Sequence, residues 1–422
     1  MNWIIISCIL CIFGCFKDFR PSESFVTNYL IESKNFTEAQ YLLCHTESHK
    51  IILLFQVNED IYPVSTYAHF ATLVIVFLVT DFVRYKPVII LCGLSGVTTF
   101  ILMIWGHDIL TIQILEFFYG LFLSTEVAYY TYIYAKVDKI HFQEVTSHTK
   151  AASLFGRCMA GIIAQLTTSF EFLNYHELNY LTLSAILFAT IWAFFLPSVG
   201  ESIYFHRKDS GTSTATDGII KSHDNLDRNV NNIAQDSYML KHQIKCSSEE
   251  NHSLVYKIRR AYKLLGKDFL QAYSNWYVVK WSIWWALSTC GYVQVISYAQ
   301  LLWQTAVEPG EKLYNGAVDF LYAVIGKNVC EVPCLCFPYS FPVKKNCMQN
   351  LDIHIFIISF EVAKHISKDS YGLIFGTNIL IALLLQSLLT AIVINGNLSL
   401  DLRAQVKLKI KIDTCAIKFI WA

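Results

Sequence analysis

Long apolar runs separated by short polar segments organise most of this chain. Six of them occupy the first part, and each approaches or exceeds the roughly 20 residues that a helix needs to cross a bilayer. We predict six spanning helices in residues 1–196, the first of them broken near Arg20-Pro21. The predicted spans are Trp3–Tyr29, Val64–Thr80, Pro87–Trp105, Thr111–Tyr134, Ala151–Phe170 and Tyr180–Leu196.

A change of pattern divides the chain after the sixth run. Residues 197–275 are rich in Ser, Asn, Asp and Lys without sustained periodicity, which predicts a cytosolic linker that is mostly disordered. Residues 276–400 form an incomplete second helical half, and residues 401–422 form an aberrant tail that alternates basic and apolar residues. The apolar runs of the second half are Tyr277–Trp303, Ala317–Ile325, Ile353–Phe360 and Leu373–Ile394. The predicted fold class is an all-α membrane protein.

Composition supports this class and excludes others. Hydrophobic residues make up 54% of the 422, and the formal net charge is zero, which argues against a nucleic-acid partner. The spacing of Cys330, Cys334, Cys336 and Cys347 matches no standard zinc pattern. No nucleophile elbow, phosphate loop or metal triad is present. We expect no enzyme activity, no metal and no cofactor.

Loop charges predict the orientation of the spans. The second loop carries Arg84 and Lys86 and the fourth is also basic, whereas residues 106–108 and 171–177 have no Lys or Arg. Basic loops face the cytosol, so the N-terminus is predicted to be cytosolic. The sequon at Asn35 then lies outside, where a glycan can be added. The basic segment Lys257–Lys263 is expected to meet anionic membrane lipid.

Two carboxylates stand inside the fourth apolar run. At about 100° per residue, Glu116, Tyr119, Glu126 and Tyr130 fall within an arc of roughly 80° on one helix face. A carboxylate in hydrocarbon is costly and marks a pathway or a ligand by default, so this stripe predicts a cation site. The alternative is a structural carboxylate paired with Arg157 or another basic residue.

Other aromatic and histidine residues have plainer interpretations. A tyrosine cluster at the end of the fourth run favours an interfacial belt, except for Tyr130, which shares the glutamate stripe. Its other members are Tyr129, Tyr132 and Tyr134. A proton-coupled step through His69, His107 or His141 is left open, since a lone histidine is more often structural.

Several segments, taken in order, resemble one known family. They are Arg20-Pro-Ser-Glu23-Ser-Phe, Thr80-Asp-Phe-Val-Arg84-Tyr-Lys-Pro87, Glu116-Phe-Phe-Tyr-Gly, Glu126-Val-Ala-Tyr-Tyr, Ser282-Ile-Trp-Trp-Ala, Gln300-Leu-Leu-Trp303, Leu313-Tyr-Asn-Gly-Ala and Leu373-Ile-Phe-Gly-Thr-Asn378. The chain resembles the reduced-folate-carrier and thiamine-transporter family, solute carrier family nineteen, a branch of the major facilitator superfamily. The resemblance implies two helical halves and uptake of a small-molecule vitamin across the plasma membrane by alternating access.

Substrate charge separates the branches of that family. Folate carriers place an arginine where this chain has Glu126 and a lysine where it has Gln386. A fixed carboxylate in a low-dielectric site attracts a cation and repels an anion, so the resemblance implies thiamine as the substrate. A reduced folate or other vitamin carrier is one alternative. A non-transporting truncated membrane protein that retains ligand binding is another.

The resemblance also assigns further residues to the substrate site. They are Glu23, Tyr62, Thr99, Phe100, Ser297 and Gln300. Ser65 stands where the thiamine branch usually has Trp, and Ser297 where it usually has Asn. Asp81, Arg84 and Lys86 resemble the facilitator-superfamily gating loop, where they would form a conformational latch.

Two stretches depart from the family pattern. Tyr41–Gln56 interrupts the first loop, and Lys327–Asn350 replaces most of spans eight, nine and the start of ten. A gene-model artefact or a shortened paralogue would each produce this pattern.

Overall fold

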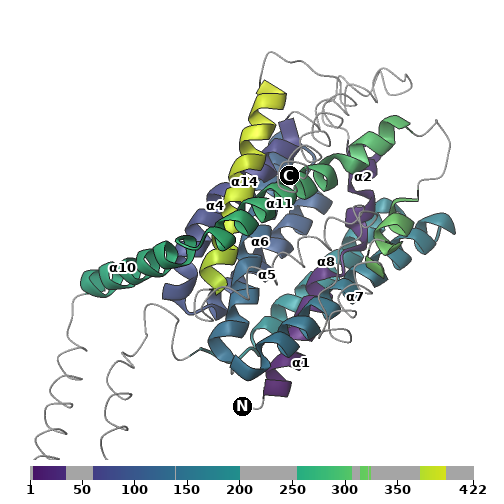
Figure 1. Ribbon diagram of the computed structural model, residues 1–422. Helices are drawn as coiled ribbons and strands as arrows, with labels where there is room; N and C mark the ends of the chain where they lie inside the picture. Colours follow the sequence, from purple (N-terminus) through teal and green to yellow (C-terminus); the bar gives the residue numbers. More distant parts are fainter. Residues whose placement is uncertain are drawn as a thin grey trace, which may run out of the picture.

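The computed structural model describes residues 3–34, 60–137, 139–199, 254–306, 314–321, 323–324 and 371–395. Within these ranges the chain is helical and contains no strand. The predicted runs at 353–360, the tail 401–422, the Cys330–Cys347 cluster and Asn35 lie outside the described residues. Figure 1 shows the helices gathered into a bundle of roughly parallel rods, with α10 projecting from one end.

The first half follows the predicted spans. The broken first span consists of α1 (Trp3–Asp18), the 3₁₀ turn η1 (Pro21–Phe25) and α2 (Val26–Ser33). It is followed by α4 (Tyr62–Val83), α5 (Lys86–Trp105), α6 (Ile109–Lys136), the turn η4 (Lys139–His141), α7 (Phe142–Ser169) and α8 (Tyr175–Ala193). The break falls at Phe19-Arg20, directly before Pro21, because proline cannot donate the next helical hydrogen bond.

Length and apolarity alone qualify four of the described helices as membrane spans. They are α4, α5, α6 and α14 (Tyr371–Asn395), over the segments Tyr62–Val83, Lys86–Trp105, Ile109–Ile133 and Leu373–Ile392. Helix α1 is apolar but has only 16 residues, with Lys17 and Asp18 at its end, whereas α7 carries more polar and charged side chains. These two helices pack along one another, so their polar groups meet inside the bundle.

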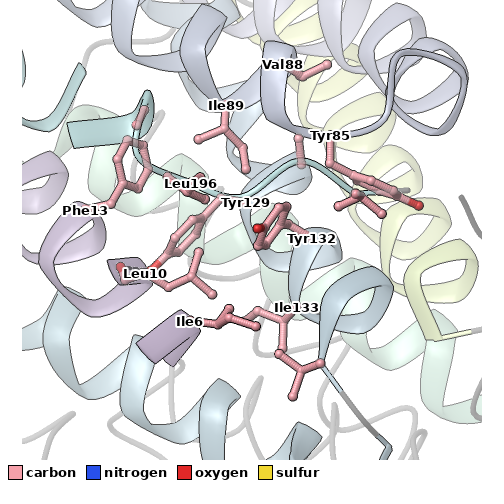
Figure 2. Packing of buried hydrophobic residues seen from close by; sticks show 14 of the residues in the cluster. Ile6, Leu10, Phe13, Tyr85, Val88, Ile89, Tyr129, Tyr132, Ile133 and Leu196 are labelled. Carbon is pink, nitrogen blue, oxygen red and sulfur yellow. Dashed lines mark hydrogen bonds between the residues drawn. The ribbon is translucent and has the colours of Figure 1, made fainter. Parts of the chain in front are cut away.

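A buried cluster at one end of the first half joins α1, α5 and α6 (Figure 2). Its members include Ile6, Leu10, Phe13 and Tyr129, all 3% exposed or less. The Tyr129 hydroxyl donates to the Leu10 carbonyl at 2.8 Å, and the Tyr132 hydroxyl donates to the Pro197 carbonyl at 2.7 Å. The predicted interfacial belt is therefore wrong for Tyr129 and Tyr132. Both are fully buried, because each phenol finds a carbonyl partner within the protein.

Glycine permits the closest contact between α1 and α7. A Cβ added at Gly156 would run into the Cys15 carbonyl oxygen, and one at Gly14 would lie 3.1 Å from the Ser153 hydroxyl oxygen of α7. Small residues let two helix backbones approach in a membrane, where packing rather than hydrophobicity drives association. This contact sets the end of α1 against Arg157, one residue beyond Gly156.

The described part of the second half consists of α10 (Leu254–Tyr273), α11 (Trp276–Ala306), a short helix at residues 315–321, and α14. Residues 254–273 belong to the predicted linker, yet they form a helix. Their apolar residues share one face opposite Lys257, Arg259, Arg260, Lys263 and Lys267, and the many charges hide this periodicity. The remaining linker residues 200–253 lie outside the described part.

Helices α11 and α14 pack on one another, and α14 also lies along α4 of the first half. Trp285 and Phe375 make an edge contact with ring centroids 4.8 Å apart. A Cβ at Gly376 of α14 would overlap the Phe77 ring of α4, so the two halves approach closely there. The site described below lies where the first half borders α11.

Candidate functional site

The glutamate stripe of α6 faces the broken first span and α7. The carboxylates Glu116 and Glu126 lie ten residues apart on this helix, and each meets different partners. Glu116 is 7% exposed, and the side chain of Glu126 is 24% exposed. The stripe therefore forms two neighbouring regions, which we call the Glu116 region and the Glu126 region.

The Glu116 region collects groups from η1, α4 and α6. Ser65 of α4 hydrogen-bonds to Glu116, and Glu23 hydrogen-bonds to Tyr119. Arg20 donates to Glu23 through Nη1 at 2.5 Å, and its guanidinium lies over the Phe122 ring, 5.3 Å from the centroid. Ser65, a departure from the family pattern, thus gives Glu116 a neutral hydroxyl partner.

The Glu126 region is a buried ion cluster. Lys17 Nζ donates to Glu126 Oε1 at 2.8 Å and lies 3.4 Å from Asp18 Oδ1. Asp18 Oδ1 also lies 3.5 Å from Arg20 Nη2 and 3.7 Å from Arg157 Nη2. Lys17 and Asp18 have only 2% and 1% of their side chains exposed, whereas Arg157 has 40%. Glu126 is thus paired with a basic residue of the protein, as the structural alternative expects, and that residue is Lys17. A substrate contact by Glu126 stays a prediction.

Tyr130 continues the stripe towards α7. The Lys150 ammonium lies 4.0 Å from the centroid of its ring, and the Tyr129 ring packs edge-on at 5.0 Å. A cation over an aromatic face is stabilised by the ring quadrupole. Tyr130 therefore already holds a cation supplied by the protein.

The stripe borders the second half through η1 and α2. Gln300 of α11 donates through Nε2 to the Glu23 carbonyl at 2.7 Å, and the Thr27 hydroxyl donates to its Oε1 at 3.1 Å. The Ser24 hydroxyl donates to Asp319 at 2.5 Å. Arg157 also interacts electrostatically with Tyr292 of α11. Residues from both halves thus meet at the break in the first span.

Four other predicted site residues contact protein groups in the structure. Tyr62 shares a 2.8 Å hydrogen bond with Thr27, so it joins the η1 and α2 contacts. The Thr99 hydroxyl donates to the Ser95 carbonyl and the Ser297 hydroxyl to the Val293 carbonyl, each within its own helix. Phe100 packs in the apolar cluster between α5 and α8. A substrate contact by Thr99, Phe100 or Ser297 stays a prediction.

The predicted gating residues hold the loop between α4 and α5. Tyr85 donates to Asp81 at 2.7 Å, and Lys86 donates to the Phe194 carbonyl at the end of α8 at 2.9 Å. Arg84 has a φ of 67° and Tyr85 of 62°, a left-handed backbone that is strained for such side chains. These contacts tie the loop to the first half, and the proposed latch stays a prediction.

Sequence reasoning missed Lys17 and Asp18. Both lie inside the predicted first span Trp3–Tyr29, directly before its break, and charges inside a span mark function by default. That rule, applied to the first span as it was to the fourth, would have found them. Among the described residues no three His, Cys, Asp or Glu side chains converge as a metal site.

The carboxylates of the site can accept hydrogen bonds from a ligand and can balance a positive charge on it. Around the break, three cationic side chains (Lys17, Arg20 and Arg157) face three carboxylates (Asp18, Glu23 and Glu126). A neutral cluster of this kind is tolerated in low dielectric because every charge is paired. A charged ligand that enters must exchange partners with one of these groups.

The family model named Reduced folate carrier matches residues 1–332 and 348–408. The gap in the family pattern is therefore narrower than the predicted Lys327–Asn350. Human "Thiamine transporter 1" is 33% identical over 96% of this chain and 86% of its own length. "Folate transporter 1" of Caenorhabditis elegans is 29% identical over 96% of this chain and 88% of its own length.

Two solved transporters have a similar fold. The inward-open xylose transporter XylE from E. coli aligns with a TM-score of 0.53 at 9% identity, covering 100% of this chain and 96% of its own. The human organic anion transporter MFSD10 aligns with a TM-score of 0.51 at 10% identity, covering 100% of both chains. The predicted facilitator-superfamily-like architecture is confirmed. With a family model that matches most of its length, this chain belongs to the reduced folate carrier family of multi-pass membrane transporters.

Proposed function

We propose that this protein takes up thiamine across the plasma membrane by alternating access, with its N-terminus in the cytosol. Relatives named as thiamine transporters and as folate transporters both match the chain. Family membership therefore indicates a vitamin carrier but does not choose between these two vitamins. The choice between the two substrates depends on the charge of the site.

The observation that carries the proposal is the pair of carboxylates on α6, Glu116 near Glu23 and Glu126 near Lys17. Thiamine carries a permanent positive charge on its thiazolium ring and an amine on its pyrimidine ring. Carboxylate oxygens accept hydrogen bonds from the amine and balance the ring charge, and charge-assisted bonds are the stronger class. Tyr119, beside Glu23, offers an aromatic face to the cationic ring.

The second half supports a cation in a different way. Gln386, at the position where folate carriers place a lysine, is neutral, and its backbone carbonyl accepts a hydrogen bond from Gln294 at 3.1 Å. A dianionic folate would therefore find no positive side chain at this position. The two α6 carboxylates would also repel it.

A reduced folate or other vitamin remains the second candidate substrate, because Lys17, Arg20 and Arg157 bring positive charge to the same cluster. An anion could pair with Arg157, whose side chain is 40% exposed. A cationic substrate would pair with the carboxylates of the cluster, and an anionic one with its basic side chains. Uptake assays with both substrates can therefore distinguish the two candidates.

The test is uptake of radiolabelled thiamine and radiolabelled folate by cells that express the full chain, normalised to surface protein. We expect saturable thiamine uptake that excess unlabelled thiamine abolishes and folate leaves unchanged. Folate uptake without thiamine uptake would contradict the proposal. Binding of thiamine by the purified protein without uptake would indicate a non-transporting binding protein.

A further inference from the structure

The most informative contact in the described part of the molecule is the one between Lys17 and Glu126. Glu126 is the carboxylate that the proposed function assigns to the substrate cation, yet it already holds a cation of the protein at 2.8 Å. Because Lys17 already neutralises the charge of Glu126, this contact bears directly on how strongly a substrate cation binds.

Lys17 approaches Glu126 from an enclosed side. The lysine side chain is 2% exposed and that of Glu126 is 24% exposed, so Glu126 is open where Lys17 is not. Lys17 lies in the last turn of α1, whose carbonyl end favours positive charge, and its ammonium lies 5.7 Å from the Tyr129 ring centroid. The protein therefore stabilises an ammonium at this point independently of Glu126.

Asp18 gives the Lys17 ammonium a second partner. Asp18 Oδ1 is 3.4 Å from Lys17 Nζ, so the lysine keeps an adjacent carboxylate when Glu126 turns away. Asp18 in turn stays near Arg20 at 3.5 Å and Arg157 at 3.7 Å while Lys17 is held by Glu126. Both arrangements leave every charge with an opposite neighbour, and an exchange between them avoids the cost of a bare buried charge.

We propose that Lys17 is a tethered counter-ion that the substrate's positive charge replaces at Glu126. In the empty carrier Lys17 neutralises Glu126; when the cation binds, Lys17 moves onto Asp18, and it returns to Glu126 as the cation leaves. Lys17 thereby lowers the affinity for cations and speeds their release. This inference rests on the proposed function and names a residue that sets its affinity.

The test is equilibrium binding of radiolabelled thiamine to the purified full chain in lipid nanodiscs, for wild type, Lys17→Met and Lys17→Arg. Lys17→Met removes the competitor while Asp18 keeps two cations, so we expect binding about tenfold tighter. Lys17→Arg can grip the carboxylate with two parallel hydrogen bonds, so we expect binding several-fold weaker than wild type. A purely structural lysine would not produce opposite changes in affinity.

Lys34 provides the matched control. It is equally buried, at 1% exposed, but its ammonium donates to the Ile104 and Gly106 carbonyls at the end of α5. Lys34→Met should lower thermal stability and leave the thiamine affinity of the folded protein unchanged. In uptake assays Lys17→Met should lower both KM and kcat, whereas a loss of folded protein would lower only the maximal rate.

The outcomes separate the two proposals. If wild type binds thiamine and folded Lys17→Met binds it no more tightly, the counter-ion inference is overturned and the proposed function stands. If Lys17→Met does not fold, Lys17→Arg decides, and unchanged or tighter binding overturns the inference. If only Lys17→Met binds thiamine, the inference holds and thiamine is not the natural substrate. If no variant binds thiamine while wild type binds folate, both proposals are overturned.

Discussion

The two halves of this transporter bury different kinds of polar group. In the first half, the break in the first span carries a cluster of paired charges built on Lys17, Asp18 and Glu126. In the described part of the second half, α11 and α14 meet through neutral groups. Gln294 of α11 donates to the Gln386 carbonyl and to Thr390 of α14, and Tyr273 at the end of α10 donates to Asn378 of α14.

This difference assigns the two halves different tasks. Paired charges are costly to break and respond strongly to the charge of a ligand, whereas neutral hydrogen bonds are indifferent to its sign. We infer that the first half discriminates substrates by charge and that α11 and α14 of the second half supply a neutral wall. The substitutions below probe that inference, from the largest expected effect to the smallest.

Asp18→Asn should be the most damaging single change. It removes the carboxylate that lies within 3.4 to 3.7 Å of three cations, and leaves an excess of buried positive charge. Breaking a buried pair of this kind costs about 3–5 kcal/mol. Thermal unfolding of the purified protein should show a large fall in Tm. Asp319→Asn, which alters the hydrogen bond with Ser24 and weaker charge interactions with Glu23 and Arg157, is the control and should cost less.

Gly156→Ala should separate α1 from α7 with an intermediate effect. The added Cβ collides with the Cys15 carbonyl, so the backbones must move apart, at a cost of about 1–3 kcal/mol. The end of α1 moves with them, so thiamine affinity should also change. Gly266→Ala is the control, because a Cβ there meets nothing within 4 Å, and it should be neutral or mildly stabilising. Equal effects of the two substitutions would contradict the close α1–α7 contact.

Gln294→Leu should have the smallest effect of the three. It removes hydrogen bonds of 3.1 Å to the Gln386 carbonyl and 2.8 Å to Thr390, at a cost of about 1 kcal/mol. The ratio of thiamine to folate uptake should stay at the wild-type value. A change in that ratio would show that the second half also reads substrate charge.

The hydrophobic pattern was sufficient to predict the helices of the first half and the break at Arg20-Pro21. The hydrophobic pattern did not predict α10, because the charges of Lys257–Lys263 interrupt any apolar run. The apolar face of this helix emerges only when residues are placed at 3.6 per turn. The pattern also failed for Tyr129 and Tyr132, since burial of a phenol depends on whether a carbonyl from another segment lies within reach. Such long-range partners are not encoded in local periodicity.

The candidate site was predicted in part for the same reason. The stripe Glu116, Tyr119, Glu126 and Tyr130 follows from helix geometry alone. The Lys17–Glu126 contact joins residues 109 positions apart, and only the packing of α1 against α6 and α7 brings them together. The sequence therefore predicts which carboxylates are costly, but the structure shows what already balances them.

The most direct test of charge discrimination in the first half is a comparison of wild type and Glu126→Gln at equal surface density, with labelled thiamine and labelled folate assayed side by side. The glutamine keeps the size of the side chain and removes its charge. We predict that thiamine uptake falls by at least tenfold while folate uptake does not fall. Thiamine uptake that is unchanged in Glu126→Gln would contradict the account.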